Sequence, residues 1–144
     1  MPEKEQAADR DRLSLEVITP ERVVLTATAA SVVVPGALGY LGILPGHAPL
    51  VTSLVPGVVT YREEGEEKRL AVSGGFLEVA DDRVILLADT AEKAEEIDVE
   101  RARRAKERAE RRLKERPPGV DVARAEIALR RAIARLKAAG EQNR

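Results

Sequence analysis

Short runs of alternating apolar and polar residues fill the first two thirds of the chain. Leu13-Ser14-Leu15-Glu16-Val17 alternates with the period of two that is typical of a half-buried strand. Turn residues such as Pro35-Gly36 and Glu64-Gly65 separate these runs. Further strands are expected at 23–27, 31–34, 58–61, 69–72, 76–79 and 84–88. The pattern predicts an antiparallel sandwich or barrel of roughly 80 residues.

The period becomes helical at Ile97-Asp98. Helices are expected at about 98–115 and 121–139, with Asp98 and Asp121 as N-caps. Pro117-Pro118-Gly119 cannot continue a helix, so the chain must reverse between them. Small apolar residues spaced by three and four predict a narrow seam between the two helices: Ala102, Ala105, Ala109 and Leu113 in the first, and Val122, Ala125, Leu129, Ala132, Leu136 and Ala139 in the second. The expected organisation is a disordered extension (1–12), a β sandwich (13–96) and an antiparallel helical hairpin (97–144).

The seam is rich in alanine, which limits its stability. Burying a methyl-sized group contributes about 0.8 kcal/mol before the entropy of ordering is subtracted. We therefore expect a marginally held hairpin, of the kind that can act as a switch.

Charge divides the chain in the same place as the hydrophobic pattern. Residues 1–97 carry 9 Lys and Arg against 17 Asp and Glu, whereas residues 98–144 carry 15 against 8. The basic half should attract both the acidic half and other anions. With aromatic residues at 2%, base stacking is not available in the hairpin, so no nucleic-acid partner is expected. Prolines and glycines interrupt the uncharged stretch 23–61, so no membrane insertion is expected either.

No residues form a convincing catalytic or metal-binding group. The chain has no cysteine and one histidine, His47, which is best interpreted as structural or part of an interface. Gly36, Gly39 and Gly42 fit no phosphate-binding motif and are better explained as turn residues. Ser73-Gly74-Gly75 indicates a bulge or a close backbone approach.

Clustered arginines leave two alternatives open. Arg101, Arg104 and Arg108 lie near one face of the first helix, and Arg131 and Arg135 are an i, i+4 pair on the second. They form either a solvated, partly ion-paired surface or a site for an anion.

Three long motifs, in order, resemble the epsilon subunit of bacterial F-type ATP synthases. They are Gly39-Tyr40-Leu41-Gly42-Ile43-Leu44-Pro45-Gly46-His47-Ala48-Pro49-Leu50, the segment from Ala71 to Val79, and the segment from Val84 to Glu92. The resemblance covers about Leu13 to Ala139. It implies a flattened ten-stranded antiparallel β sandwich followed by a two-helix hairpin, an α+β fold.

The same resemblance implies the partners and the location of the chain. The sandwich is expected to bind the gamma subunit and the ring of c subunits, with Tyr40, Leu41, His47 and Ala48 at a partner interface. The hairpin can fold onto the sandwich or extend toward the alpha/beta hexamer and obstruct ATP hydrolysis. The chain would be peripheral, at the cytoplasmic face of the bacterial plasma membrane. Many relatives carry an acidic residue where this chain has Tyr40.

Some members of this family bind ATP in the folded-down form through an Ile/Leu-Asp-x-x-Arg-Ala motif, here Ile97 to Ala102. Carried over residue by residue, the resemblance implies that base and ribose contact Glu92, Ile97, Asp98 and Ala102. Arg101 belongs to the same motif, and Arg108, Arg131 and Arg135 would face the phosphates. No cofactor is expected to be required; ATP would be a regulatory ligand that need not carry Mg²⁺.

These implications lead to one expected function and one alternative. The expected function is that of a noncatalytic central-stalk subunit that couples the catalytic head to the c ring through gamma and inhibits hydrolysis through a mobile, ATP-binding hairpin. The alternative is a free-standing module that senses ATP or another anion.

Overall fold

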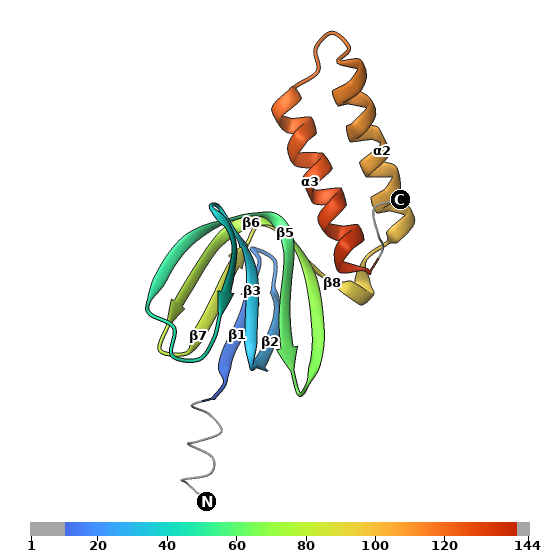
Figure 1. The fold of residues 1–144 in the computed structure, drawn as a ribbon. Helices are drawn as coiled ribbons and strands as arrows, with labels where there is room; N and C mark the ends of the chain where they lie inside the picture. Colours follow the sequence, from blue (N-terminus) through green and yellow to red (C-terminus); the bar gives the residue numbers. More distant parts are fainter. Residues whose placement is uncertain (1–10, 141–144) are drawn as a thin grey trace, which may run out of the picture.

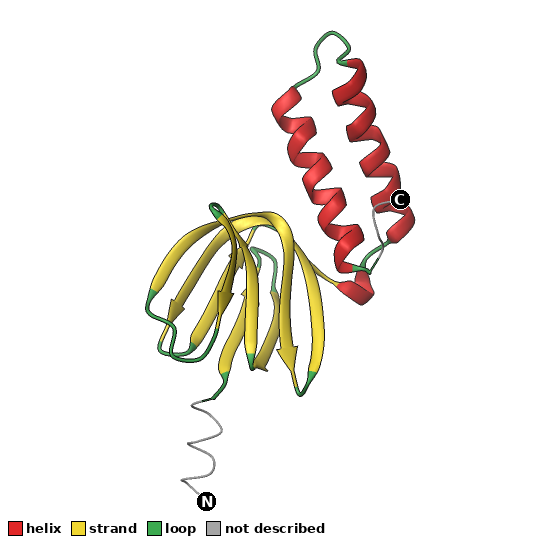
Figure 2. Ribbon diagram, in the orientation of Figure 1, coloured by secondary structure: helices red, strands yellow, loops and turns green. Residues whose placement is uncertain are grey.

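The structure, a computed structural model, describes residues 11–140. Figure 2 shows strands and helices in separate parts of the molecule, so the predicted β sandwich followed by a two-helix hairpin is confirmed. Residues 1–10 of the predicted extension lie outside the described residues. The strands are β1 (Leu13–Ile18), β2 (Val23–Ala29), β3 (Ser31–Gly36), β4 (Gly39–Ile43), β5 (Leu50–Glu63), β6 (Glu66–Ala80), β7 (Arg83–Ala88) and β8 (Ala91–Lys93), followed by the 3₁₀ helix η1 (Ala94–Glu96) and the helices α2 (Val99–Glu115) and α3 (Val122–Ala138).

The sandwich core contains the apolar residues that alternate along the strands. In β1, Leu13, Leu15 and Val17 are fully buried while the intervening positions face outward or are half-buried. The same alternation buries Leu77 and Val79 of β6. These side chains meet in a single cluster, so the period of two read from the sequence positions the core correctly.

The described residues contain eight strands rather than the ten that the resemblance implies, because β5 and β6 are long. These two strands pair with each other from Leu50–Val79 to Glu63–Glu66. β5 also pairs with β3, at Thr60–Arg62 and again at Leu54, while the two halves of β6 pair with β8 and β7. Counting each half separately recovers the expected ten. Figure 1 shows β5 and β6 curving over the end of the sandwich nearest the hairpin.

Sequence patterning alone missed β4, β8 and the first half of β5. In β4, Gly39 and Gly42 are strand residues, so the turn role predicted for the glycines is wrong for Gly42. One further difference concerns strand direction: β1 and β7 are parallel, although all the other pairs are antiparallel. Long connections place these two strands side by side, and no local pattern reports such a pairing.

Both helices begin at the predicted caps. The Asp98 carboxylate accepts a hydrogen bond from the Arg101 backbone N–H at 3.1 Å, and Asp121 does the same for Arg124. Each cap satisfies one of the N–H groups that a helix N-terminus leaves without a partner. The helix starts are therefore specified locally, as the sequence indicated.

α3 is buried on two faces. Ala125, Ala132 and Leu136 belong to the predicted seam with α2 and are buried. A second set of small residues, two positions out of phase, contacts the sandwich instead. We call this contact the docking cluster; it comprises Val58, Ala71, Ile97, Ala134 and Ala138. No helix within residues 11–140 is both long and apolar enough to span a membrane.

Candidate functional site

A cavity of about 380 Å³ lies where the hairpin meets the sandwich. The sandwich contributes residues from β6 and from the segment around β8, and the hairpin contributes arginines from both helices. Its lining consists of Ala71, Val72, Ser73, Thr90, Glu92, Arg101, Arg131 and Arg135. The volume is within the range of small-molecule sites. Because its walls belong to two parts of the chain, the cavity depends on the packing of the hairpin against the sandwich.

One ion pair crosses this cavity. Arg135 of α3 approaches Glu92 of β8 with Nε 2.8 Å from Oε1 and Nη2 3.2 Å from Oε2. Both side chains are partly shielded, with 22% and 35% of their surfaces exposed. Paired approach of a guanidinium to a carboxylate is a geometry that phosphate oxygens can also adopt. Glu92 therefore occupies one anion position of the site.

The remaining charge of the cavity is positive. Arg101 and Arg131 line it together with the Glu92–Arg135 pair. Among residues 11–140, no carboxylate forms an ion pair with Arg101 or Arg131. Two guanidinium groups thus remain to bind an anion, which favours the second of the two alternatives left open by the sequence.

Two hydroxyl groups in the cavity were not predicted as site residues. The side-chain hydroxyls of Ser73 and Thr90 share a hydrogen bond, and the Ser73 backbone N–H donates to the Thr90 carbonyl at 3.2 Å. They come together because β6 pairs with β8. Since β8 has only three residues, its pairing leaves too weak a pattern to find this pair from the sequence.

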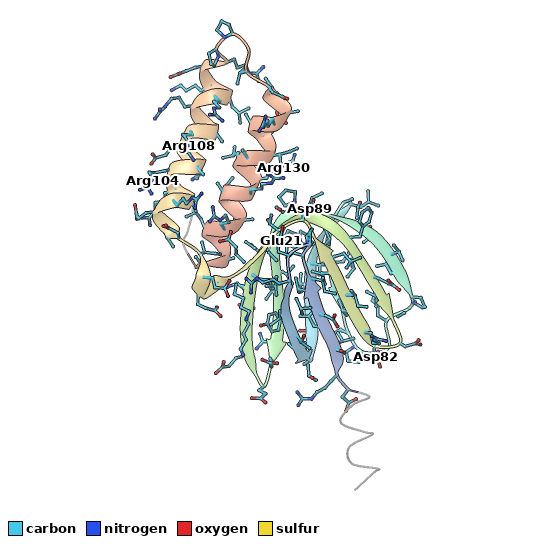
Figure 3. The ribbon with its side chains drawn as sticks, turned by 180° about the vertical axis from the view of Figure 1, so that it is seen from behind. Glu21, Asp82, Asp89, Arg104, Arg108 and Arg130 are labelled. Carbon is cyan, nitrogen blue, oxygen red and sulfur yellow. The ribbon has the colours of Figure 1, made fainter. Side chains whose placement is uncertain are left out.

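The structure brings four of the eight predicted ATP-binding residues to this cavity: Glu92, Arg101, Arg131 and Arg135. Ile97 is buried in the docking cluster. Asp98 caps α2, and Ala102 is fully buried. Arg108 is exposed and does not line the cavity; it lies two turns farther along α2, about 10 Å from Arg101. Figure 3 labels Arg104 and Arg108 on successive turns of α2.

The four predicted partner-interface residues lie in β4 and in the loop that follows it. Ala48 is exposed, whereas His47 and Leu41 are half-buried, and Leu41 packs against the sandwich core. The loop is fixed by Asp82, whose Oδ1 accepts a hydrogen bond from the Gly46 N–H at 2.7 Å. Tyr40 is 60% exposed, and its hydroxyl oxygen accepts a hydrogen bond from the Val58 N–H at 3.1 Å.

Another cavity, of about 350 Å³, lies beside the turn between β5 and β6. Its charges are mixed: Lys68 and Glu63 pair at 2.8 Å within it. The hydrogen bond from Lys68 lowers the pKa of the Glu63 carboxyl, and the same bond raises the pKa of Lys68. This cavity therefore lacks the excess of cationic groups that distinguishes the cavity below the hairpin.

Comparison with known sequences agrees with the two parts of the fold. The sequence model for the ATP synthase Delta/Epsilon chain beta-sandwich domain matches residues 12–94, and that for the Delta/Epsilon chain long alpha-helix domain matches residues 95–140. The chain belongs to the epsilon family of bacterial ATP synthases. Its place in this family identifies it as a subunit of that complex. The epsilon chain of Moorella thermoacetica is 73% identical over 89% of this chain and 96% of its own length. That of Desulforamulus reducens is 55% identical over 87% and 95%.

Solved structures give the same family fold. A chain of the Euglena gracilis mitochondrial ATP synthase, in a structure of its OSCP, F1 and c-ring, matches with a TM-score of 0.78. It is 28% identical, and the match covers 91% of this epsilon-family chain and 82% of that chain. A chain from the central stalk and c-ring of the Tetrahymena thermophila enzyme shares the fold, with a TM-score of 0.57 at 15% identity, over 88% and 96% of the two chains.

Proposed function

We propose that this chain is the noncatalytic central-stalk subunit that couples the catalytic head of a proton-translocating ATP synthase to the c ring through gamma. Its hairpin would restrain ATP hydrolysis when it extends toward the alpha/beta hexamer. ATP would bind without being hydrolysed when the hairpin is folded down. The observation that carries this proposal is the basic cavity shared between hairpin and sandwich.

The contact that holds the hairpin down is small. The docking cluster contains only one valine and one isoleucine besides its three alanines. Each buried methyl contributes about 0.8 kcal/mol, so the total is modest against the entropy of ordering two helices. A ligand present at a hundred times its dissociation constant adds about 2.7 kcal/mol to the state that binds it. Nucleotide in the cavity would therefore shift the hairpin strongly toward its docked position.

Triphosphate suits the chemistry of the cavity. Arg101, Arg131 and Arg135 supply cationic groups for several phosphate oxygens, and Ser73 and Thr90 supply neutral hydrogen-bonding groups on the opposite wall. The three guanidinium groups would neutralise the charge of the phosphates. ATP is thus proposed as a regulatory ligand, and no cofactor is required.

The outer face of the sandwich offers a surface for gamma. Cross-strand pairing aligns Val23, Ile18, Leu87 and Phe76 in one row across β2, β1, β7 and β6. Val23, Leu87 and Phe76 are 54%, 51% and 60% exposed. An exposed apolar row of this kind is typical of a protein interface. We assign it to gamma because the row lies on a rigid sheet, whereas the helical hairpin, called the arm from here on, must stay free to move.

A single substitution tests this assignment. Phe76→Asp should weaken binding to the cognate gamma subunit at least tenfold, because an aromatic anchor would be replaced by a charge that must be desolvated. Ile127→Asp is the matched control, since Ile127 is an exposed apolar residue of α3. Affinity would be measured by co-elution and by titration calorimetry. Equal affinity for gamma in the two variants would contradict the assignment.

Failure of the unmodified chain to bind gamma would reject the stalk function as a whole. If ATP still bound tightly in that case, the chain would instead be a free-standing ATP or anion sensor. We place the c ring at Tyr40, Leu41, His47 and Ala48, next to the exposed side chains of Leu38 and Leu44. The location proposed is peripheral, at the cytoplasmic face of the plasma membrane, with neither nucleic acid nor inserted segments involved.

A further inference from the structure

The pairing between β3 and β5 is interrupted beside the hairpin. Val33 pairs with Thr60, and the next pair in the ladder is Gly36 with Leu54. β5 therefore carries extra residues on this edge, and its backbone groups need other partners there. The Val58 N–H finds one in the hydroxyl of Tyr40, at 3.1 Å. A side chain of β4 thus replaces a missing strand contact at the residue whose own side chain enters the docking cluster.

Tyr40 reaches this position because β5 has a glycine there. A Cβ at Gly57 would lie 2.6 Å from Pro35 Cβ and 2.8 Å from the Tyr40 hydroxyl oxygen. Only a residue without a side chain allows the tyrosine to lie across the strand at this point. The Tyr40 hydroxyl is therefore held against Val58 by steric fit as well as by its hydrogen bond.

α3 lies directly over the same place. A cavity of about 130 Å³ is lined on one side by Tyr40, Pro56, Gly57 and Val58 and on the other by Arg130, Ile133, Ala134 and Lys137. Figure 3 shows Arg130 on the side of α3 that faces the sandwich. Ala134 belongs to the docking cluster together with Val58. Tyr40 thus fixes the section of β5 on which α3 rests and also forms part of the surface beside it.

We propose that Tyr40 is a positioning residue for the docked hairpin: by holding the Val58 backbone in place, it favours the folded-down arm. Because Tyr40 is itself 60% exposed, a partner that displaced its ring from this position would at the same time loosen the arm. The inference rests on the proposed function in one respect, namely that the arm can detach. It is independent of whether nucleotide binds.

The experiment measures the ratio of detached to docked arms in the full chain. The absence of cysteine allows two to be introduced cleanly, as Glu78→Cys on β6 and Glu126→Cys on α3, both at exposed positions. Spin labels on them report the distance between sandwich and arm. Tyr40→Phe removes only the hydroxyl and should raise the detached-to-docked ratio about fivefold, the effect of one neutral hydrogen bond. Tyr61→Phe is the matched control, because it removes the hydroxyl of the other tyrosine, which lies in the sandwich core.

Three outcomes are distinguishable. A ratio that rises in Tyr40→Phe but not in Tyr61→Phe, with an unchanged circular dichroism spectrum, supports the proposal. A detached population that is equal in both variants overturns it and leaves the proposed function intact. A third variant, Gly57→Ala, keeps the tyrosine but adds a methyl group that collides with its hydroxyl. If neither this variant nor the two tyrosine variants shows a detached population, the positioning role and the mobile arm fail together.

Discussion

Replacing Arg131 and Arg135 together by alanine is expected to abolish the rise in melting temperature that ATP causes in this chain. At a hundred times its dissociation constant, ATP should raise the melting temperature of the parent chain by about 5 to 10 °C. Both arginines line the cavity, and both come from α3. Without them, a triphosphate would meet Arg101 alone, opposite a Glu92 carboxylate that no longer has Arg135 as its partner. Electrostatic repulsion from that carboxylate would then remove the remaining affinity.

The matched control removes the same amount of charge from elsewhere on the arm. Arg104→Ala with Arg111→Ala deletes two exposed arginines of α2 that do not line the cavity. This variant should keep the full ATP-induced shift in thermal unfolding, and calorimetry should show one bound ATP. An undiminished shift in the Arg131/Arg135 variant would show that these arginines take no part in binding. Loss of the shift in both variants would mean that ATP binding depends only on the overall charge of the hairpin.

The second large effect is expected at Gly75 of β6. Gly75 has φ +125°, and a Cβ there would overlap the carbonyl oxygen of Leu87 in the neighbouring strand. Gly75→Ala should therefore lower the free energy of unfolding by about 2 to 4 kcal/mol, because both the backbone conformation and the strand spacing become strained. The loss would be measured by urea unfolding followed by circular dichroism.

Gly42→Ala serves as the comparison for this substitution. Gly42 also lies in a strand, but a Cβ there meets no atom within 4 Å. Its free energy of unfolding should change by less than about 0.5 kcal/mol. Similar losses in the two variants would show that the sandwich tolerates a side chain at Gly75, and that the close approach of β6 to β7 is not needed for stability.

Several features of the fold were predicted correctly from the sequence, and they can be traced to particular residues. Local signals gave correct answers: alternation located the core residues Leu13, Leu15 and Val17, and the helix starts at Asp98 and Asp121 were confirmed. The prediction of a close backbone approach at Ser73-Gly74-Gly75 was also confirmed. Each of these depends on chemistry within a few residues along the chain.

The features of the fold that could not be predicted from the sequence depend on contacts between distant segments. The parallel pairing of β1 with β7 and the meeting of Ser73 with Thr90 leave no local pattern. The second buried face of α3, with Ala134 and Ala138, was hidden because alanine is compatible with either environment. At the candidate site, the resemblance supplied four residues that line the cavity, but the spacing of residues alone could not have separated them from Arg108.

The use of alanine on the second face of α3 has a consequence for the solubility of the arm. In the proposed detached state, the surface of α3 that becomes solvent-exposed would carry the methyl groups of Ala134 and Ala138 beside the half-buried side chain of Ile133. Such a surface is too small and too weakly apolar to attract other molecules. The Ala125, Ala132 and Leu136 side chains remain covered by α2. Repeated release would therefore carry little risk of aggregation, which a leucine-lined contact would have introduced at every cycle.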